Sequence, residues 1–519
     1  MAQDSARTSR TMSPKSTDDE EKDIGQSQRE HPSSQDTTQS HDPEKQTSNN
    51  ASHNDDDQKK LDDWDSPGDA DNPLNWPTSK KAYHTLIPST IAFVCTLGSS
   101  IITPGQESIM SDLGVSMEVS LLPYVLYVIG LAFGPMLAAP LSETFGRRAV
   151  YWTGMPVFML FTLGAGFSNN IAALCICRFF SAVFGSPGLS IGSATISDIW
   201  TPLQRAAPMT FYVTTPFLGP AIGPLVGGFV AEKMGWRWTV WTLLFFEVAC
   251  LSPALFMKET YKKAILRKRA KARGLRYPEP ERTPVQAAKF FLRSTLTRPA
   301  HMFCVEPVVL CFTSYVSINF GTLYAFFAAF PYVFETQYGF GLGQVGLFFI
   351  GLGVGSTAGG AFIIVFSKLM YGRKIAQHGK VPPEAKLYLA MIGSLCLPVS
   401  LFWFGWTTQE KVHWMAPVVA EAIFGFGNLL IFMSSVLYVM DFYGPLVGAS
   451  AMGANNLGRY ALGAIFPLFI VQMYRGLGIG WATSLLGFVS VVLAPIPWVL
   501  FMFGPTLRSR STYAKPEGN

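Results

Sequence analysis

The chain has 519 residues, 49% of them apolar and only 14% charged, with a formal net charge of +5. So large an apolar share argues against an ordinary soluble protein, and nothing in the charge balance indicates nucleic-acid binding. These averages combine two unlike parts. Residues 1–81 hold 18 of the 35 acidic side chains, whereas the remainder has 17 acidic against 30 basic ones.

The first part, residues 1–80, is rich in Asp, Ser, Gln, Asn and His and contains few aliphatic side chains. Such a segment cannot bury enough apolar surface to offset the loss of chain entropy, so we predict a disordered tail. The glycosylation sequon at Asn50 is expected to stay unmodified, because the orientation derived below places this tail in the cytoplasm.

Apolar runs of about 20 residues, the length that crosses a bilayer, recur through the rest of the chain. The twelve predicted spans are 83–103, 121–141, 149–168, 171–193, 209–231, 238–257, 303–330, 343–367, 387–405, 414–440, 447–473 and 481–503. This pattern predicts an all-α membrane protein with twelve transmembrane helices.

The basic residues predict how these helices are oriented. In the loops and tails beside the spans, 26 Lys and Arg residues lie on the side of the N-terminus and 4 on the opposite side. Because Lys and Arg concentrate in cytoplasmic loops, both termini are predicted to be cytoplasmic.

The spans divide into six and six around a basic connector. "FGRR" (145–148) follows span 2, and "YGRK" (371–374) follows span 8 in the matching place, which supports two homologous halves with a substrate path between them. The predicted units are the tail 1–80, the halves 81–257 and 303–503, the connector 258–302 and a C-terminal tail 504–519. We interpret the connector's charge as fixing topology; contact with anionic lipid is the alternative.

The loop between spans 2 and 3 reads "APLSETFGRR" (139–148). Its glycine permits a tight turn, and a carboxylate–guanidinium pair in it can latch helix ends. The loop resembles the signature motif of the major facilitator superfamily, although Ala139 and Thr144 depart from that motif. The gating residues that this resemblance implies are Glu143, Gly146, Arg147 and Arg148. Simple anchoring of the loop on the cytoplasmic side is the alternative.

Span 5 contains "GPAIGPLVGG" (219–228), an unusual number of helix-weakening residues for an apolar segment. Glycine costs less in a membrane helix, and glycines four apart form a flat stripe that a neighbouring helix can approach. Each proline removes a backbone donor and bends the helix. The stretch resembles the antiporter motif of the superfamily's drug and proton exchangers. Its residues are Gly219, Pro220, Gly223, Pro224, Gly227 and Gly228.

Other segments are similar to those of fungal twelve-span drug and polyamine exporters. They are "DNPLNWP" (71–77), "RFFSAVFGSPG" (178–188), "WRW" (236–238) and "ETYKKAILRKRA" (259–270). The resemblance covers residues 71 to about 505, and it implies the fold of that superfamily and transport by alternating access.

Five predicted spans contain one charged residue each, and each should face protein or water because a charge in lipid is costly. They are Arg178, Glu247, Glu306, Glu421 and Arg459. We hypothesise that Glu421, alone or with Glu247, takes up a coupling proton. Arg178 or Arg459 would bias its proton affinity. Glu306, near the end of its span, is interpreted as a gate or interface residue, and a packing role is the alternative for Glu247.

Polar and aromatic side chains in spans 7, 10 and 11 form the predicted lining of the substrate cavity. These candidates are Asn319, Tyr324, Phe327, Asn428, Asn455 and Asn456. Such a lining suits bulky amphipathic or cationic molecules better than sugars.

We therefore predict a proton-coupled exporter of drugs, toxins or secondary metabolites, monomeric and in the plasma membrane rather than the vacuolar membrane. A proton-coupled uptake symporter or polyamine transporter of the same fold is the alternative within transport, and a membrane nutrient sensor is the alternative outside it. Clustered metal ligands and a phosphate-binding loop are missing from the sequence, so no enzyme activity, metal or cofactor is expected.

Overall fold

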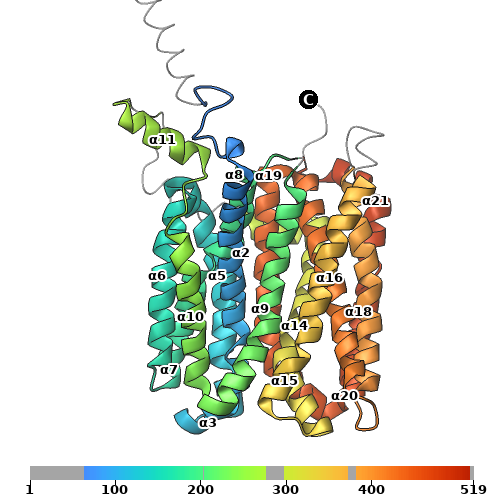
Figure 1. Ribbon diagram of the computed structural model, residues 1–519. Helices are drawn as coiled ribbons and strands as arrows, with labels where there is room; N and C mark the ends of the chain where they lie inside the picture. Colours follow the sequence, from blue (N-terminus) through green and yellow to red (C-terminus); the bar gives the residue numbers. More distant parts are fainter. Residues whose placement is uncertain (1–62, 203, 276, 278–296, 372–381, 515–519) are drawn as a thin grey trace, which may run out of the picture. The chain divides into compact units, whose positions relative to one another are not determined.

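The computed structural model describes residues 63–202, 204–275, 277, 297–371 and 382–514. In these ranges all regular structure is helical (Figure 1). The predicted disorder of residues 1–62, the sequon at Asn50 and most of "YGRK" (371–374) lie outside the described residues.

The chain forms two groups of long helices. The first comprises α2 (Thr78–Ser100), α5 (Leu122–Phe145), α6 (Arg147–Gly166), α7 (Ile171–Gly185), α8 (Pro187–Ile199), α9 (Ala206–Met234) and α10 (Trp236–Ala254). The second comprises α14 (Pro307–Tyr338), α15 (Leu342–Phe348), α16 (Ile350–Phe366), α18 (Leu387–Thr407), α19 (Met415–Leu477), α20 (Ile479–Leu493) and α21 (Ile496–Arg510). Between them lie α11 (Lys262–Ala272) and α13 (Arg298–Val305).

Short elements complete the described chain. They are η1 (Pro73–Asn75), η2 (Thr103–Gly105), α3 (Gln106–Leu113), α4 (Met117–Ser120), the π-helical turn η4 (Ser367–Tyr371) and η5 (Pro383–Lys386). In Figure 1, α3, α15 and α20 lie at one end of the helices, which we call the α3 end, and α11 lies at the other, the α11 end.

Eleven stretches of the described chain are long and apolar enough to cross a membrane. They correspond to eleven of the twelve predicted spans. The remaining prediction, 238–257, falls on α10, whose mean hydropathy is reduced by the charged side chains of Arg237 and Glu247. The prediction of an all-α membrane protein with twelve spans is therefore confirmed.

Proline and glycine mark several of the places where the helices break. Span 4 is divided at Ser186, and Pro187 begins α8; Pro307 likewise begins α14 after the break at Glu306. Proline cannot continue the backbone hydrogen bonds of a preceding turn but suits the first turn of a helix. Spans 10 and 11 form one element, α19, broken at Gly444, which has a φ of 73°.

The outer faces of the helices are apolar, as lipid requires. Phe245 on α10, Leu160 on α6 and Val492 on α20 each expose more than half of their surface. Polar side chains such as Ser99, Thr239 and Ser394, in contrast, lie fully inside. This inversion of the pattern of soluble proteins follows from a hydrocarbon environment.

The two groups contact each other chiefly through α9, which packs on α15 and α16, and through α5, which packs on α19. Within the first group α2 packs on α9 and α8, and within the second α14, α16 and α18 pack on α19. The helix with the glycine- and proline-rich stretch is therefore a main element of the boundary between the groups.

Candidate functional site

The signature loop forms a network of charged groups at the α11 end. Gly146 has a φ of 95°, a conformation that glycine adopts without strain. The Glu259 carboxylate accepts hydrogen bonds from the backbone N–H groups of Arg147 (2.9 Å) and Arg148 (3.0 Å) at the start of α6. The Arg147 Nε lies 3.2 Å from Oδ2 of Asp198, at the end of α8.

The carboxylates of this network differ from the one that the motif implied. Glu143 is exposed, and it forms no hydrogen bond or ion pair within the described part of the chain. Its position near the end of α5, three residues before Gly146, turns it to the surface, so Asp198 and Glu259 take the expected place beside Arg147. In the sequence, the "ETY" segment of the connector pointed to Glu259, whereas no motif pointed to Asp198.

The glycine stripe of α9 packs on α2, as its spacing predicts. A Cβ atom on Gly219 would lie 2.2 Å from Thr96 Oγ1, and one on Gly223 would lie 1.9 Å from Ser100 Oγ. At Gly227 it would lie 2.1 Å from the carbonyl oxygen of Ile101. These three positions accommodate no side chain while the helices remain at this separation. Despite Pro216, Pro220 and Pro224, α9 is continuous.

A second set of glycines brings the two helix groups together. A Cβ atom on Gly228 would lie 2.6 Å from the carbonyl oxygen of Leu342, at the start of α15. On the opposite side, one on Gly346 would lie 2.5 Å from the carbonyl oxygen of Pro224, and one on Gly360 would lie 2.6 Å from Thr214 Oγ1. At Gly228 and Gly346 the boundary between α9 and α15 is therefore nearly backbone against backbone, an approach that only small residues permit.

Arg178 and Glu247 lie in the interior of the first group. Arg178 donates a hydrogen bond to the carbonyl oxygen of Gly98, and its guanidinium lies 4.0 Å from the centre of the Tyr127 ring. Glu247 is fully buried and accepts a hydrogen bond of 2.7 Å from Thr162 Oγ1. Its second oxygen, Oε2, has no hydrogen-bond partner among the described residues.

Glu421 is the most isolated charged side chain of the described spans. It is 2% exposed, and neither carboxylate oxygen has a hydrogen-bond partner within the described chain. Neither Arg178 nor Arg459 forms an ion pair with it in the described residues. In this conformation, therefore, no described contact supports the hypothesis that an arginine acts on Glu421.

Arg459 faces the boundary between the groups. It donates a hydrogen bond of 2.9 Å to Asn456 Oδ1, and its guanidinium lies 4.7 Å from the ring centres of Phe320, Phe432 and Tyr460. Phe432 also contacts Phe217 of α9, with ring centres 5.4 Å apart. This set of rings is a favourable environment for a cation.

Glu421 and Phe432 share a face of α19, because positions 421, 425, 428 and 432 repeat at helical spacing. Asn428 on that face is buried, and its side-chain nitrogen has no described partner. Asn319 and Asn455 are also buried, each with one unpartnered side-chain atom among the described residues. These predicted cavity residues thus retain unused hydrogen-bonding capacity.

Tyr324 and Phe327 lie where α14 meets the first group, so they fill space that the prediction assigned to a cavity. The Tyr324 hydroxyl lies 3.3 Å from Ser99 Oγ, and the Tyr124 hydroxyl donates to the carbonyl oxygen of Tyr324 over 3.3 Å. The rings of Tyr124 and Phe327 pack edge to face. Aromatic side chains therefore fill the space between α14 and the first group at this level, and we call this contact the aromatic closure.

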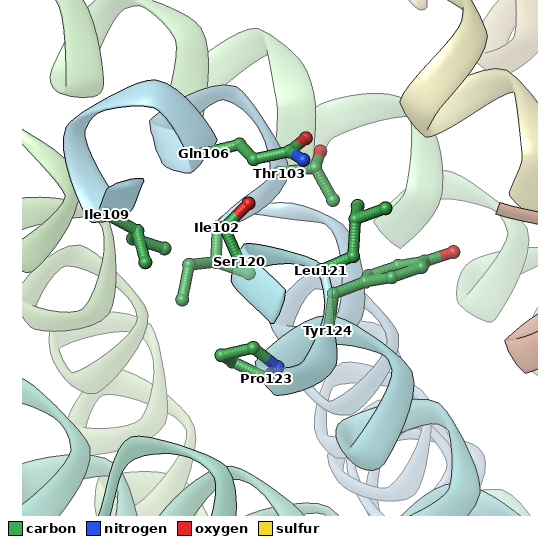
Figure 2. A pocket seen from close by; sticks show the side chains of 8 residues that line it. All are labelled: Ile102, Thr103, Gln106, Ile109, Ser120, Leu121, Pro123 and Tyr124. Carbon is green, nitrogen blue, oxygen red and sulfur yellow. The ribbon is translucent and has the colours of Figure 1, made fainter. Parts of the chain in front are cut away.

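Beyond this closure, toward the α3 end, a small pocket lies between η2, α3, α4 and α5 (Figure 2). Its lining consists of Ile102, Thr103, Gln106, Ile109, Ser120, Leu121, Pro123 and Tyr124. Tyr124 belongs both to this pocket and to the aromatic closure. The predicted cavity residues do not line it.

Comparison with known proteins gives a consistent result. The family model of the Major Facilitator Superfamily matches residues 89–467. The chain is 40% identical over 484 residues to Polyamine transporter 4 of Saccharomyces cerevisiae, covering 87% of this chain and 73% of that protein. It is 37% identical over 462 residues to the efflux pump FUBT of Fusarium oxysporum, covering 87% and 77%. A citrinin biosynthesis cluster transporter of Monascus ruber is 36% identical over 467 residues, covering 88% and 92%.

Among solved structures, the xylose transporter XylE from E. coli, in a partially occluded inward-open conformation, shares the fold with a TM-score of 0.59 and 15% identity. The match covers 81% of this chain and 98% of that one. The family model, the relatives and the twelve spans agree: the chain belongs to the major facilitator superfamily and is a multi-pass membrane transporter of small molecules.

Proposed function

We propose that the protein is a proton-coupled antiporter that exports small amphipathic or cationic organic compounds by alternating access. The Glu421 carboxylate carries this proposal: it has no partner within the described chain, and it shares a helical face with Phe432, whose ring contacts Arg459. A buried carboxylate without a cation beside it must be neutralised by a proton or by a positively charged ligand. Competition between the two for one carboxylate gives exchange of a proton for an organic cation.

The helix boundary supports the alternating-access part of the proposal. The glycine surfaces of α9 and α15–α16 allow the two groups to tilt against each other, and the rings of Tyr124 and Tyr324 close one end of the path. In the antiporter cycle, we propose, these rings separate while the charged network around Arg147 breaks or re-forms.

The relatives support export, since they include efflux pumps and a transporter from a biosynthetic gene cluster. The polyamine transporter among them makes polyamines a second candidate cargo, and a flexible polycation suits the carboxylate and the aromatic rings equally well. We further propose a monomer in the plasma membrane with both termini cytoplasmic, from the distribution of Lys and Arg. The same placement leaves Asn50 unmodified.

The direction of coupling can be tested in sealed vesicles that contain the purified protein. An antiporter accumulates a permanent organic cation when the vesicle interior is acidic, whatever the orientation of the protein, because proton exit drives cation entry. A symporter accumulates its cargo only when the exterior is acidic. The membrane potential is held at zero in both cases, and protein-free vesicles correct for leakage. Accumulation under an acidic exterior alone would overturn the proposal.

A further inference from the structure

Residues 63–71 bind the connector helix α11 through four aspartates. The Lys262 Nζ lies 2.7 Å from Asp63 Oδ1, and Arg273 Nη2 lies 2.5 Å from Asp65 Oδ2. Arg269 contacts three carboxylates of this segment. Its partners are Asp65 at 3.0 Å, Asp69 at 2.7 Å and Asp71 at 2.7 Å. Composition alone predicts disorder for this segment, but its ion pairs with α11 fix its position.

Arg269 and Asp69 form the centre of this contact. The pair is bidentate, with Nη1–Oδ2 and Nη2–Oδ1 distances of 2.7 and 3.0 Å, and both side chains are largely shielded from solvent. The hydrogen bonds from Arg269 lower the pKa of Asp69 to about 2. Bidentate Arg–carboxylate pairs are stronger and more directional than single contacts, so this pair fixes the register of the segment on α11.

The segment has a defined shape of its own. The Asn75 side-chain amide donates hydrogen bonds to the carbonyl oxygens of Pro67 (2.8 Å) and Asp69 (3.0 Å). The backbone N–H of Asp69 donates to the carbonyl oxygen of Ser66. The Trp64 ring lies 5.9 Å from Lys262 Nζ and 5.8 Å from the Arg269 guanidinium. Hydrogen-bonded turns in residues 66–75 thus fix the backbone around Asp69 and Asp71.

Both partners are attached to the first helix group. Lys81 of α2 donates through Nζ to the carbonyl oxygen of Leu74, 2.8 Å away. The backbone N–H of Lys258 donates to His84 Nε2, also of α2, and Glu259 caps the start of α6. Between these attachments, α11 buries only Leu266 and Ala270. An 11-residue helix with so little apolar contact is marginal alone.

We propose that residues 63–71 form an acidic strap that holds α11 on the first helix group, so that α11 moves as part of that group. Residues 262–272 of the connection between the two groups then belong mechanically to the first group. The contact between the strap and α11 does not depend on the proposed function. Its role during transport does, because that role requires the two groups to tilt.

Hydrogen exchange on the full-length protein in lipid nanodiscs tests the strap. Substitution Arg269→Asp removes three ion pairs and should accelerate amide exchange in residues 262–272 by about tenfold, which corresponds to ~1.4 kcal/mol. Lys271→Asp is the matched control, since it makes the same charge change on α11 at an exposed site that has no described ion pair. Its exchange should stay within about twofold of the wild type.

The charge swap Asp69→Arg with Arg269→Asp should restore most of the protection, which a general loss of folding would not permit. Equal exchange in the wild type and in Arg269→Asp would overturn the strap. So would equal acceleration by Lys271→Asp, or protection that depends on anionic lipid in the nanodisc instead of on Asp69, because α11 would then be held by the membrane surface. No substrate or gradient is used, so failure of the antiporter proposal leaves this result readable.

Discussion

At the scale of single residues, the buried charged side chains differ in the hydrogen-bond partners that surround them. Arg178 contacts a carbonyl oxygen and an aromatic ring, and one oxygen of Glu247 accepts a hydrogen bond from a threonine hydroxyl, although Arg178 Nε and Glu247 Oε2 have no partner among the described residues. Glu421 has no described partner. Since an unpaired charge in a membrane interior is expensive, a residue of this kind is retained for a ligand or a proton rather than for stability.

Substitution Glu421→Gln should reduce accumulation of an organic cation driven by a pH gradient by at least about tenfold, because glutamine has nearly the same shape but cannot exchange a proton. The measurement is initial uptake into vesicles with an acidic interior, at matched protein content. Glu410→Gln, a change in the exposed segment between α18 and α19, is the control and should retain full activity. Uphill transport at the wild-type rate by Glu421→Gln would remove this residue from the coupling mechanism.

The charged network at the α11 end supports a prediction about stability. Asp198→Asn should lower the free energy of unfolding by about 1.5–3 kcal/mol, since it weakens a largely buried hydrogen bond between charged groups. Glu143→Gln should leave it unchanged, because that side chain is exposed and has no described contact. Thermal unfolding of the detergent-solubilised protein compares the two. A larger loss of stability for Glu143→Gln than for Asp198→Asn would instead assign the latch to Glu143, the residue that the sequence motif implied.

At the scale of elements, the glycines of α9 have separate tasks on two faces. Gly219, Gly223 and Gly227 allow close packing on α2 within one group, whereas Gly228 contacts α15 of the other. The first face fixes the position of the helix, and in the proposed transport cycle the second is the surface along which the groups would move. One motif in the sequence would then serve both packing and motion.

Gly223→Val should destabilise the protein by about 1–3 kcal/mol, because its Cβ would lie 1.9 Å from Ser100 Oγ and 3.1 Å from the backbone nitrogen of Ile101. Gly476→Val is the matched control: a Cβ there meets no atom within 4 Å. The unfolding temperature and the surface expression of the two variants are compared. Similar behaviour of both variants would show that α2 and α9 can separate without cost.

At the scale of the whole molecule, the carboxylates of the strap and those within the spans are expected to respond differently to pH. The strap depends on Asp69, whose pKa falls from 3.8 to about 2 because of Arg269. A carboxyl group with a depressed pKa contributes stability above its unfolded value, and this contribution is lost as the pH falls toward 2. The strap is therefore complete throughout the physiological range.

We expect the protection of α11 from hydrogen exchange, corrected for intrinsic rates, to be the same at pH 8 and pH 5. Any change of transport across that interval then comes from groups outside the strap, such as carboxylates within the spans and histidine side chains. Raising NaCl from 0.1 to 1 M, which shortens the Debye length from ~10 to ~3 Å, should instead weaken the exposed contacts of Asp63 and Asp65. Loss of protection at pH 5 would contradict the assignment of Asp65, Asp69 and Asp71 to Arg269 and Arg273.

The sequence by itself determined the helices and the main packing surface. An apolar run of about 20 residues has few alternatives to a membrane helix, and glycines four apart on such a helix define a stripe before any neighbour is known. For this reason the twelve spans and the stripe Gly219–Gly223–Gly227 could be predicted from local pattern alone. The breaks at Pro187 and Pro307 carried a local signal as well, although the predicted spans ran through them.

Only the tertiary structure decided which charged groups meet. Asp198 and Glu259 reach Arg147 from positions 51 and 112 residues away, and the strap reaches Arg269 across about 200 residues. It also decided that Tyr324 and Phe327 pack against the first group, whereas Glu421 has no partner among the described residues. Pairing between distant residues depends on which helices are neighbours and on their rotation, and local composition contains neither quantity.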